Sequence, residues 1–104
     1  MFDDRKKQFE KKSVMNAENK FKVSSKRNRM LGRWAAEKMN LESNLVEDYI
    51  ESVIEADFEK PGHDDVLEKI NNDFKNKNLE ITANTIESKL NEFEKLAFDE
   101  INNQ

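Results

Sequence analysis

The residues of this chain that could carry out chemistry are few, and their spacing favours structure over catalysis. His63 is the only histidine and cysteine is absent, which excludes a thiol nucleophile, a disulfide scaffold, a zinc finger and an iron–sulfur site. Four carboxylates near His63 could be read as a hard-cation site: Asp57, Glu59, Asp64 and Asp65. Their spacing matches no calcium-binding loop, and acids before a helix are explained by its dipole. We therefore predict no metal site.

Other catalytic arrangements are also missing. Gly32 and Gly62 stand alone, so neither belongs to a phosphate-binding loop. Carboxylate pairs are plentiful among 22 acidic residues, but in so acidic a chain such pairs usually form a solvated face. We predict that the protein is not an enzyme, has no catalytic residue and needs no cofactor.

Charge is distributed unevenly along the 104 residues. Residues 1–40 carry twelve Lys or Arg and five Asp or Glu, a balance of +7, whereas residues 41–104 carry six and seventeen, a balance of −11. Such asymmetry indicates a charged partner: a nucleic acid, an anionic membrane, an acidic protein surface or the acidic remainder of the chain. No apolar run could span a bilayer or serve a signal peptide, so we expect a soluble, cytoplasmic protein.

Helical patterns recur along the chain, and β patterns are nearly absent. Thr82 is a good N-cap with Ile81 and Ile86 placed as a hydrophobic staple, which predicts a helix from about Ala83 to Ile101. The preceding helix is predicted to begin at Asp64 and Asp65 and to present Val66, Ile70 and Phe74 on one face. Asn78 is predicted to end it in the left-handed conformation, with Leu79 folding back on Phe74.

Two further helices are predicted upstream. Ser43 is expected to cap one that ends before Pro61, and a long first helix closes at Met39 and Asn40. Four helices with short connections predict an all-α fold, a four-helix bundle of antiparallel neighbours. Its core is expected to contain Met30, Leu31, Trp34, Tyr49, Val53, Phe58, Ile70, Phe74, Leu90 and Phe93.

Apolar residues become sparse toward the N-terminus. Residues 1–20 offer chiefly Phe2, Phe9, Val14 and Met15 among many charges. That is too little apolar surface to offset an ordering entropy of roughly 1–2 kcal/mol per residue. We predict an N-terminal arm, residues 1–19, that is mobile or partly helical when free and becomes ordered on a partner, followed by a four-helix domain, residues 20–104.

Gly32 interrupts the first helical pattern and needs a reason, because a glycine inside a helix costs about 1 kcal/mol relative to alanine. It lies one turn from Ala36 and near the bulky Trp34. A close crossing with another helix, with Trp34 as a core anchor, is favoured over direct contact with a ligand.

Three stretches together resemble the zeta subunit of bacterial F-type ATP synthases, the ATPase-inhibitor family: FDDRKKQFEKK, RNRMLGRWAAEKMNL and EADFEKPGHDDVLEKI. The resemblance covers essentially the whole chain. It implies a four-helix protein whose N-terminal segment enters the catalytic head between the α and β subunits near γ. There the segment becomes helical and blocks rotation in the hydrolysis direction.

The resemblance also assigns residues. The inhibitory segment falls on residues 1–17, and its partner-binding residues are expected to be Phe2, Asp3, Asp4, Arg5, Lys6, Phe9 and Glu10. The central family motif falls on Arg27, Asn28, Leu31, Gly32, Trp34, Ala35 and Ala36. We expect a monomer when free, peripheral on the cytoplasmic face of the membrane-bound synthase, with no nucleic-acid partner and no membrane insertion. Weak adenine-nucleotide binding has been suggested for such subunits, but no motif here locates it.

Two alternatives stay open at this point. Lys6, Lys7, Lys11 and Lys12 make the arm more basic than is usual in the family, and Ser13 stands where an apolar residue is expected, so the protein could be a non-inhibitory helical scaffold subunit. A nucleic-acid-binding module that uses the basic arm is the other alternative. The five acids among residues 1–40 and the absence of a recognition helix argue against it.

Overall fold

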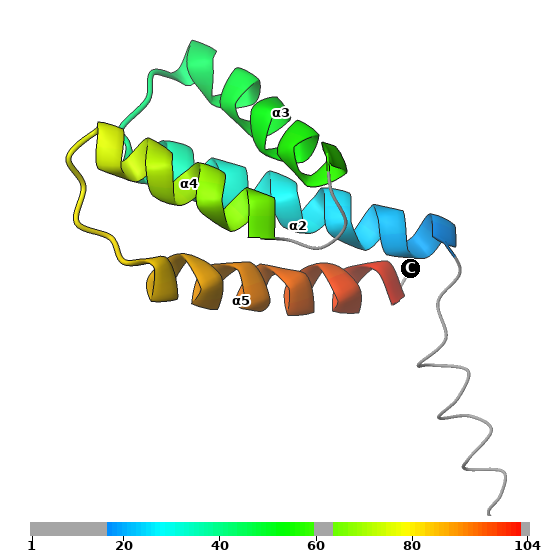
Figure 1. The fold of residues 1–104 in the computed structure, drawn as a ribbon. Helices are drawn as coiled ribbons and strands as arrows, with labels where there is room; N and C mark the ends of the chain where they lie inside the picture. Colours follow the sequence, from blue (N-terminus) through cyan, green and yellow to red (C-terminus); the bar gives the residue numbers. More distant parts are fainter. Residues whose placement is uncertain (1–16, 60–63, 103–104) are drawn as a thin grey trace, which may run out of the picture.

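The computed structural model describes residues 17–59 and 64–102, and four α-helices account for most of them (Figure 1). They are α2 (Ala17–Lys38), α3 (Ser43–Glu59), α4 (Asp64–Asn76) and α5 (Ala83–Asn102). The described ranges contain no strand. The predicted all-α class is therefore confirmed. Nearly all of the predicted arm, and the turn at Pro61, lie outside the described residues.

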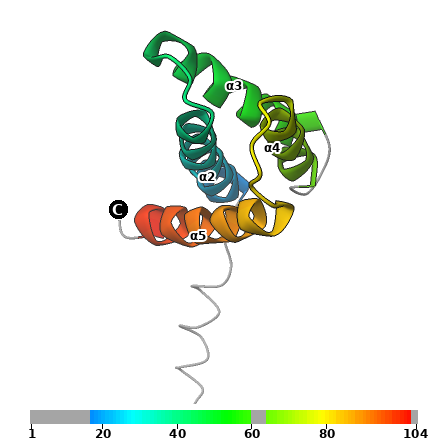
Figure 2. The same ribbon diagram turned by 90° about the vertical axis from the view of Figure 1, so that its left-hand side faces the viewer.

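Successive helices run in opposite directions along the molecule (Figure 1). α2 packs against both α3 and α5, and α4 completes the arrangement by contacting α3 and α5. Figure 2 shows the four helices around a common centre, with α2 and α4 on opposite sides and α5 beneath them. This is the predicted four-helix bundle, and α2 is the helix that connects its two sides.

Asparagines end two of the helices in the same way. Asn40 and Asn78 both have left-handed backbones, with φ of 60° and 61°. After α4, the Leu79 N–H donates to the Phe74 carbonyl (2.9 Å) and the Asn78 N–H donates to the Lys75 carbonyl (3.0 Å). This pair of bonds is the Schellman motif, and it satisfies carbonyls that the helix leaves free. The predicted cap at Asn78 is confirmed.

The end of α2 repeats this motif. The Leu41 N–H donates to the Ala36 carbonyl (3.1 Å) and the Asn40 N–H donates to the Glu37 carbonyl (3.0 Å). Asparagine tolerates the left-handed conformation better than most residues, so it suits both positions. The predicted closure of the first helix at Met39 and Asn40 is confirmed.

Hydroxyl side chains were predicted to cap the starts of two helices, and one of the two caps forms. Thr82 caps α5 as predicted, because its Oγ1 accepts the Thr85 N–H at 3.2 Å. Ile81 packs against the cluster that contains Ile86, as a hydrophobic staple requires. Ser43, in contrast, is the first residue of α3 rather than the cap before it.

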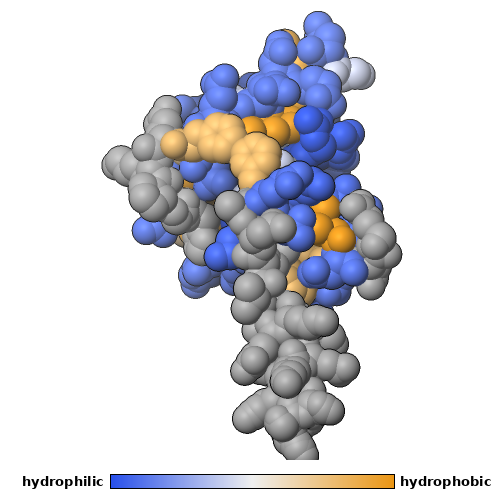
Figure 3. Space-filling view, turned by 90° about the vertical axis from the view of Figure 1, so that its right-hand side faces the viewer, coloured by the Kyte–Doolittle hydropathy of each residue, from blue (hydrophilic) through white to orange (hydrophobic). Residues whose placement is uncertain are grey.

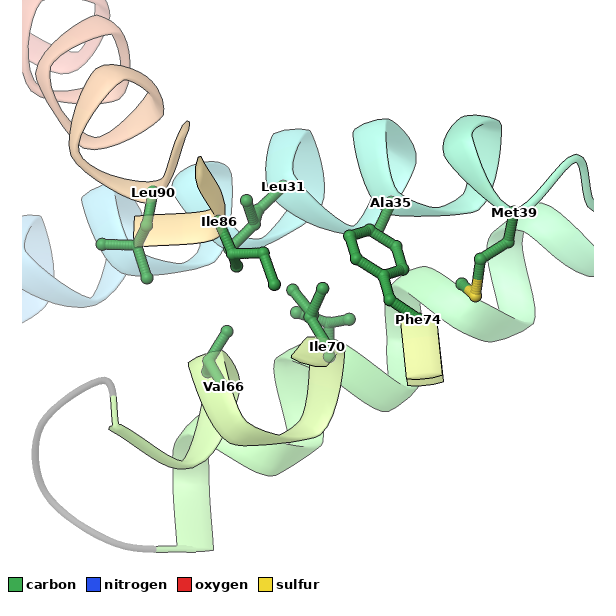
Figure 4. Close-up of a cluster of buried hydrophobic side chains, with 9 residues drawn as sticks. Leu31, Ala35, Met39, Val66, Ile70, Phe74, Ile86 and Leu90 are labelled. Atoms are coloured by element: carbon green, nitrogen blue, oxygen red, sulfur yellow. The ribbon is translucent and has the colours of Figure 1, made fainter. Parts of the chain in front are cut away.

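The core lies where α2, α4 and α5 meet, with α3 closing it. Figure 4 shows Ile70 and Phe74 of α4 beneath Leu31 and Ala35 of α2, with Ile86 of α5 beside them. Nine buried residues form this cluster: Leu31, Ala35, Met39, Val53, Val66, Ile70, Phe74, Ile86 and Leu90. Trp34, Tyr49 and Phe93 are half-buried against it, so most of the predicted core is confirmed.

Two of the predicted core residues lie elsewhere. Met30 is half-buried and outside the cluster. Phe58 is 60% exposed, so its assignment to the core was wrong. The preceding residue, Asp57, faces inward toward Arg27. Because neighbouring residues of a helix are turned by about 100° from each other, Phe58 points away from the centre.

Candidate functional site

The residues predicted to carry function fall into two groups, and the structure describes only one. The predicted partner-binding residues of the arm lie outside the described residues: Phe2, Asp3, Asp4, Arg5, Lys6, Phe9 and Glu10. The central motif, from Arg27 to Ala36, lies within α2. The residues of the motif contact different neighbours, and together these contacts fix the position of α2 in the bundle.

Gly32 lies at the crossing of α2 and α3. A Cβ atom built on Gly32 would be 3.1 Å from the backbone Cα of Ile50 and 3.3 Å from its Cγ1. These distances are shorter than ordinary van der Waals contact, so a side chain here would push the two backbones apart. The predicted close helix crossing is confirmed, and it accounts for a glycine inside a helix.

Arg27 lies at the centre of a charged network that joins three helices. Its guanidinium donates to Asp57 Oδ2 of α3 at 3.0 Å, to Glu94 Oε1 of α5 at 2.9 Å, and to the neighbouring Asn28 Oδ1 at 3.0 Å. Asn28 Nδ2 donates to the same oxygen of Asp57 at 2.9 Å. The network therefore fixes the position of α2 relative to both α3 and α5.

The burial of this network determines how α2 packs in the bundle. The Arg27 side chain is 7% exposed and that of Asp57 is 13% exposed, whereas Glu94 is half-exposed. A buried charge without a partner is strongly unfavourable, so α2 has to dock with Arg27 opposite Asp57. The planar guanidinium donates three N–H groups in fixed directions. These bonds therefore set the orientation of α2 as well as its distance from α3 and α5.

The apolar residues of the motif form the inner face of α2. Leu31, Ala35 and Ala36 are fully buried. Trp34 is half-buried, and its ring meets that of Phe74 edge to face, with centroids 5.6 Å apart. Trp34 thus joins α2 to α4, and its predicted role as a core anchor is confirmed.

A second polar contact ties α3 to α4. The Tyr49 hydroxyl donates to Asp73 Oδ2 at 2.7 Å, and Lys69 Nζ donates to the same oxygen at 3.0 Å. Lys69 Nζ also lies 5.0 Å from the centre of the Tyr49 ring, over its face. Burial raises the pKa of the Tyr49 hydroxyl far above its ordinary value, and the hydrogen bond to Asp73 and the charge of Asp73 raise it further.

Comparison with known proteins assigns the chain to a protein family. The family model for ATPase inhibitor subunit zeta matches residues 1–100. The chain belongs to the ATPase inhibitor subunit zeta family. No curated protein and no solved structure matches it. The description of the family, an ATPase inhibitor subunit, supports in general an inhibitory role on ATP synthase.

In this zeta-family chain, the Asp57 carboxylate is engaged by side chains of α2. That carboxylate already accepts hydrogen bonds from Arg27 and Asn28. Asp64 and Asp65 occupy the first turn of α4, where the helix dipole favours acids. His63 and the side chain of Glu59 lie outside the described residues, and no group of three or more potential ligands occurs among the described ones. None of the described helices has the length and apolar character needed to cross a membrane.

The sequence did not reveal an exposed aromatic pair at the end of the bundle where α2 begins. Phe21 of α2 and Phe58 of α3 stack with their ring centroids 5.7 Å apart and their planes within 5°. They are 52% and 60% exposed. Figure 3, which faces this end, shows apolar surface next to hydrophilic residues. Each phenylalanine is unremarkable in sequence, because 37 residues separate them and only the crossing of α2 and α3 brings them together.

Proposed function

We propose that this protein inhibits ATP hydrolysis by inserting its N-terminal segment, residues 1–17, into the catalytic head of F-type ATP synthase. The segment enters at the interface of the α, β and γ subunits, becomes helical there and blocks rotation in the hydrolysis direction. The observation that carries the proposal is the extent of the family match, which begins at residue 1 and so includes this segment.

The fold supports the proposal through the direction of α2. This helix begins at Ala17, the last residue of the segment, and packs against both α3 and α5. Arg27 and Gly32 fix it against α3 and α5. A segment that becomes helical on the head would be continuous with α2. The inserted segment and the folded body would then form one rigid unit.

The proposed segment has the residue pattern of a helix that binds in a groove. Phe2 and Phe9 are seven residues apart, which places them on the same face of a helix as apolar anchors. Asp3 and Asp4 suit the start of that helix, and Arg5 lies between the two anchors, where it can pair with an acidic rim.

Three proteins and two assays test the proposal. The wild type, a variant that lacks residues 1–17, and the double variant Phe2→Ala/Phe9→Ala are added to the cognate synthase. ATP hydrolysis and proton-driven ATP synthesis are then measured separately. We expect the wild type to slow hydrolysis and spare synthesis. The truncated variant should keep the helical circular dichroism spectrum and lose inhibition, and the double variant should inhibit weakly.

A matched control tests whether the two phenylalanines act as specific anchors or whether any double substitution in the segment reduces inhibition. Phe2→Ala/Phe9→Ala removes two apolar side chains, whereas Lys11→Ala/Lys12→Ala changes two basic residues of the same segment that are not among its expected partner-binding residues. We expect the lysine variant to retain most of the inhibition at moderate ionic strength, because screened surface charges contribute little. Equal inhibition by the truncated and the intact protein would refute the proposed mechanism.

The second candidate function is a passive scaffold subunit. Lys6, Lys7, Lys11 and Lys12 make the segment strongly basic, and Ser13 interrupts its apolar residues. Both features weaken an apolar anchoring face. This candidate is favoured if the protein co-purifies with the synthase and changes neither hydrolysis nor synthesis.

A further inference from the structure

An open groove of about 350 Å³ lies at the end of the bundle where α2 begins. Three cationic side chains of α2 line it: Lys22, Lys26 and Arg29. Apolar side chains from three helices form the rest of its surface: Phe21 of α2, Ile54 of α3 and Ile101 of α5. Phe21 continues this surface outward, because its ring stacks on the exposed Phe58.

We propose that this groove, together with Phe21 and Phe58, is a second contact with the catalytic head, and that it binds an acidic protein segment with apolar side chains. The inference rests on the proposed function, which brings this end of the protein against the head. It adds a docking contact of the folded body to the inserted segment.

Charge complementarity selects an acidic occupant. None of the residues that line the groove is a carboxylate. The three cations do have partners within the chain, since Lys22 pairs with Glu18 at 3.7 Å, Lys26 with Glu100 at 3.4 Å and Arg29 with Glu47 at 3.3 Å. These pairs are on the surface, and exposed pairs contribute little to stability. A partner's carboxylates can therefore replace them without unfolding the bundle.

Apolar surface makes a protein segment a better occupant than a simple anion. Phe21 and Phe58 are half-exposed or more, so part of each ring remains in water in the isolated protein. An amphipathic helix laid in such a groove buries apolar residues of one face and places acidic residues opposite the lysines. Burial of the two rings would supply affinity, and the charges would orient the partner.

The groove's position couples it to the inserted segment. Phe21 lies four residues after Ala17, which corresponds to about 6 Å along the helix axis. A segment inserted in the head up to residue 17 would hold the groove next to the surface of the head. Two linked contacts bind more tightly than either alone, because the second forms at high effective concentration.

Charge reversal in the full-length protein tests the contact. The probe is the catalytic head of α, β and γ subunits, purified free of this protein, and the dissociation constant is measured at low and at high ionic strength. We expect Lys22→Glu/Lys26→Glu to raise the dissociation constant at low ionic strength by about tenfold or more. Phe21→Ala should raise it at both ionic strengths.

The control variant has the same change in net charge as the groove variant, at a site far from the groove. Lys75 and Lys77 are exposed. Lys75 lies in the last turn of α4 and Lys77 directly after it. Figure 1 shows the end of α4 at the opposite end of the bundle from the start of α2. We expect Lys75→Glu/Lys77→Glu to bind the head like the wild type. Circular dichroism and urea unfolding establish that each variant is folded.

The outcomes separate this inference from the proposed function. If the wild type inhibits hydrolysis and Lys22→Glu/Lys26→Glu binds the head as tightly as the wild type, the docking contact is refuted and the inserted segment stands. If the groove reversal and the control reversal weaken binding equally, the effect is one of net charge and the contact is refuted as well. Binding of the wild type to phosphatidylglycerol vesicles but not to the head would refute both proposals.

Discussion

Gly32 and Ile50 bring α2 and α3 together so closely that a Cβ on Gly32 would lie 3.1 Å from the Cα of Ile50. The atom that limits the space belongs to the backbone of α3, so no side-chain rotation can relieve the contact. The glycine therefore sets the distance between the two helices. It also determines whether Phe21 can reach Phe58 and Arg27 can reach Asp57, because both pairs join the same two helices.

Alanine at position 32 is expected to destabilise the protein despite its better helix propensity. The gain from replacing a helical glycine is about 1 kcal/mol, whereas overpacking of a close interface costs about 1–3 kcal/mol. We expect Gly32→Ala to lower the free energy of unfolding by up to about 2 kcal/mol, measured by urea denaturation. Gly32→Val should cost more. Ser88→Ala, at an exposed position of α5, is the control and should change stability little. A more stable Gly32→Ala variant would show that the crossing can widen freely.

Removal of the Arg27 guanidinium should be among the most destabilising single changes to the bundle. Arg27→Met keeps an apolar stem but leaves Asp57 buried without its cation, and breaking a buried pair in this way costs about 3–5 kcal/mol. Urea denaturation of Arg27→Met, Asp57→Leu and the double variant measures the coupling between the two side chains. Arg29→Met is the control, because the pair of Arg29 with Glu47 is exposed. Equal effects of the two arginine variants would contradict the role given to the network.

The sequence predicted the helices well because their ends depend on local residues. Asn78 and Thr82 act on backbone groups within five residues of themselves, so their capping roles can be inferred from a short stretch. Arg27 is different. Its partners Asp57 and Glu94 lie 30 and 67 residues away, and nothing nearby distinguishes it from the other basic residues of the chain. Its position in the family motif was recognised, but its burial and its role were not predicted.

The exposure of Phe58 leads to a prediction that contrasts it with Phe74. Both were expected in the core, but Phe74 is fully buried and Phe58 is 60% exposed. Phe74→Ala should lower the free energy of unfolding by about 3–5 kcal/mol, because it leaves a cavity. Phe58→Ala should cost no more than about 1.5 kcal/mol, chiefly the stack with Phe21. Thermal or urea unfolding followed by the fluorescence of Trp34, the only tryptophan, compares them directly. Similar losses would place Phe58 inside the core after all.

Stability should fall at high pH through Tyr49, whose pKa is raised in the folded protein by burial and by Asp73. An unfolded tyrosine loses its proton near pH 10, while folded Tyr49 keeps it, so protons favour the folded state above that pH. The contribution is complete below about pH 10 and decreases by about 1.4 kcal/mol per pH unit above it. We expect urea denaturation to show a steeper decrease for the wild type than for Tyr49→Phe. Because Tyr49 is the only tyrosine, ultraviolet absorbance reports its ionisation directly, and a midpoint near pH 10 in the folded protein would contradict the prediction.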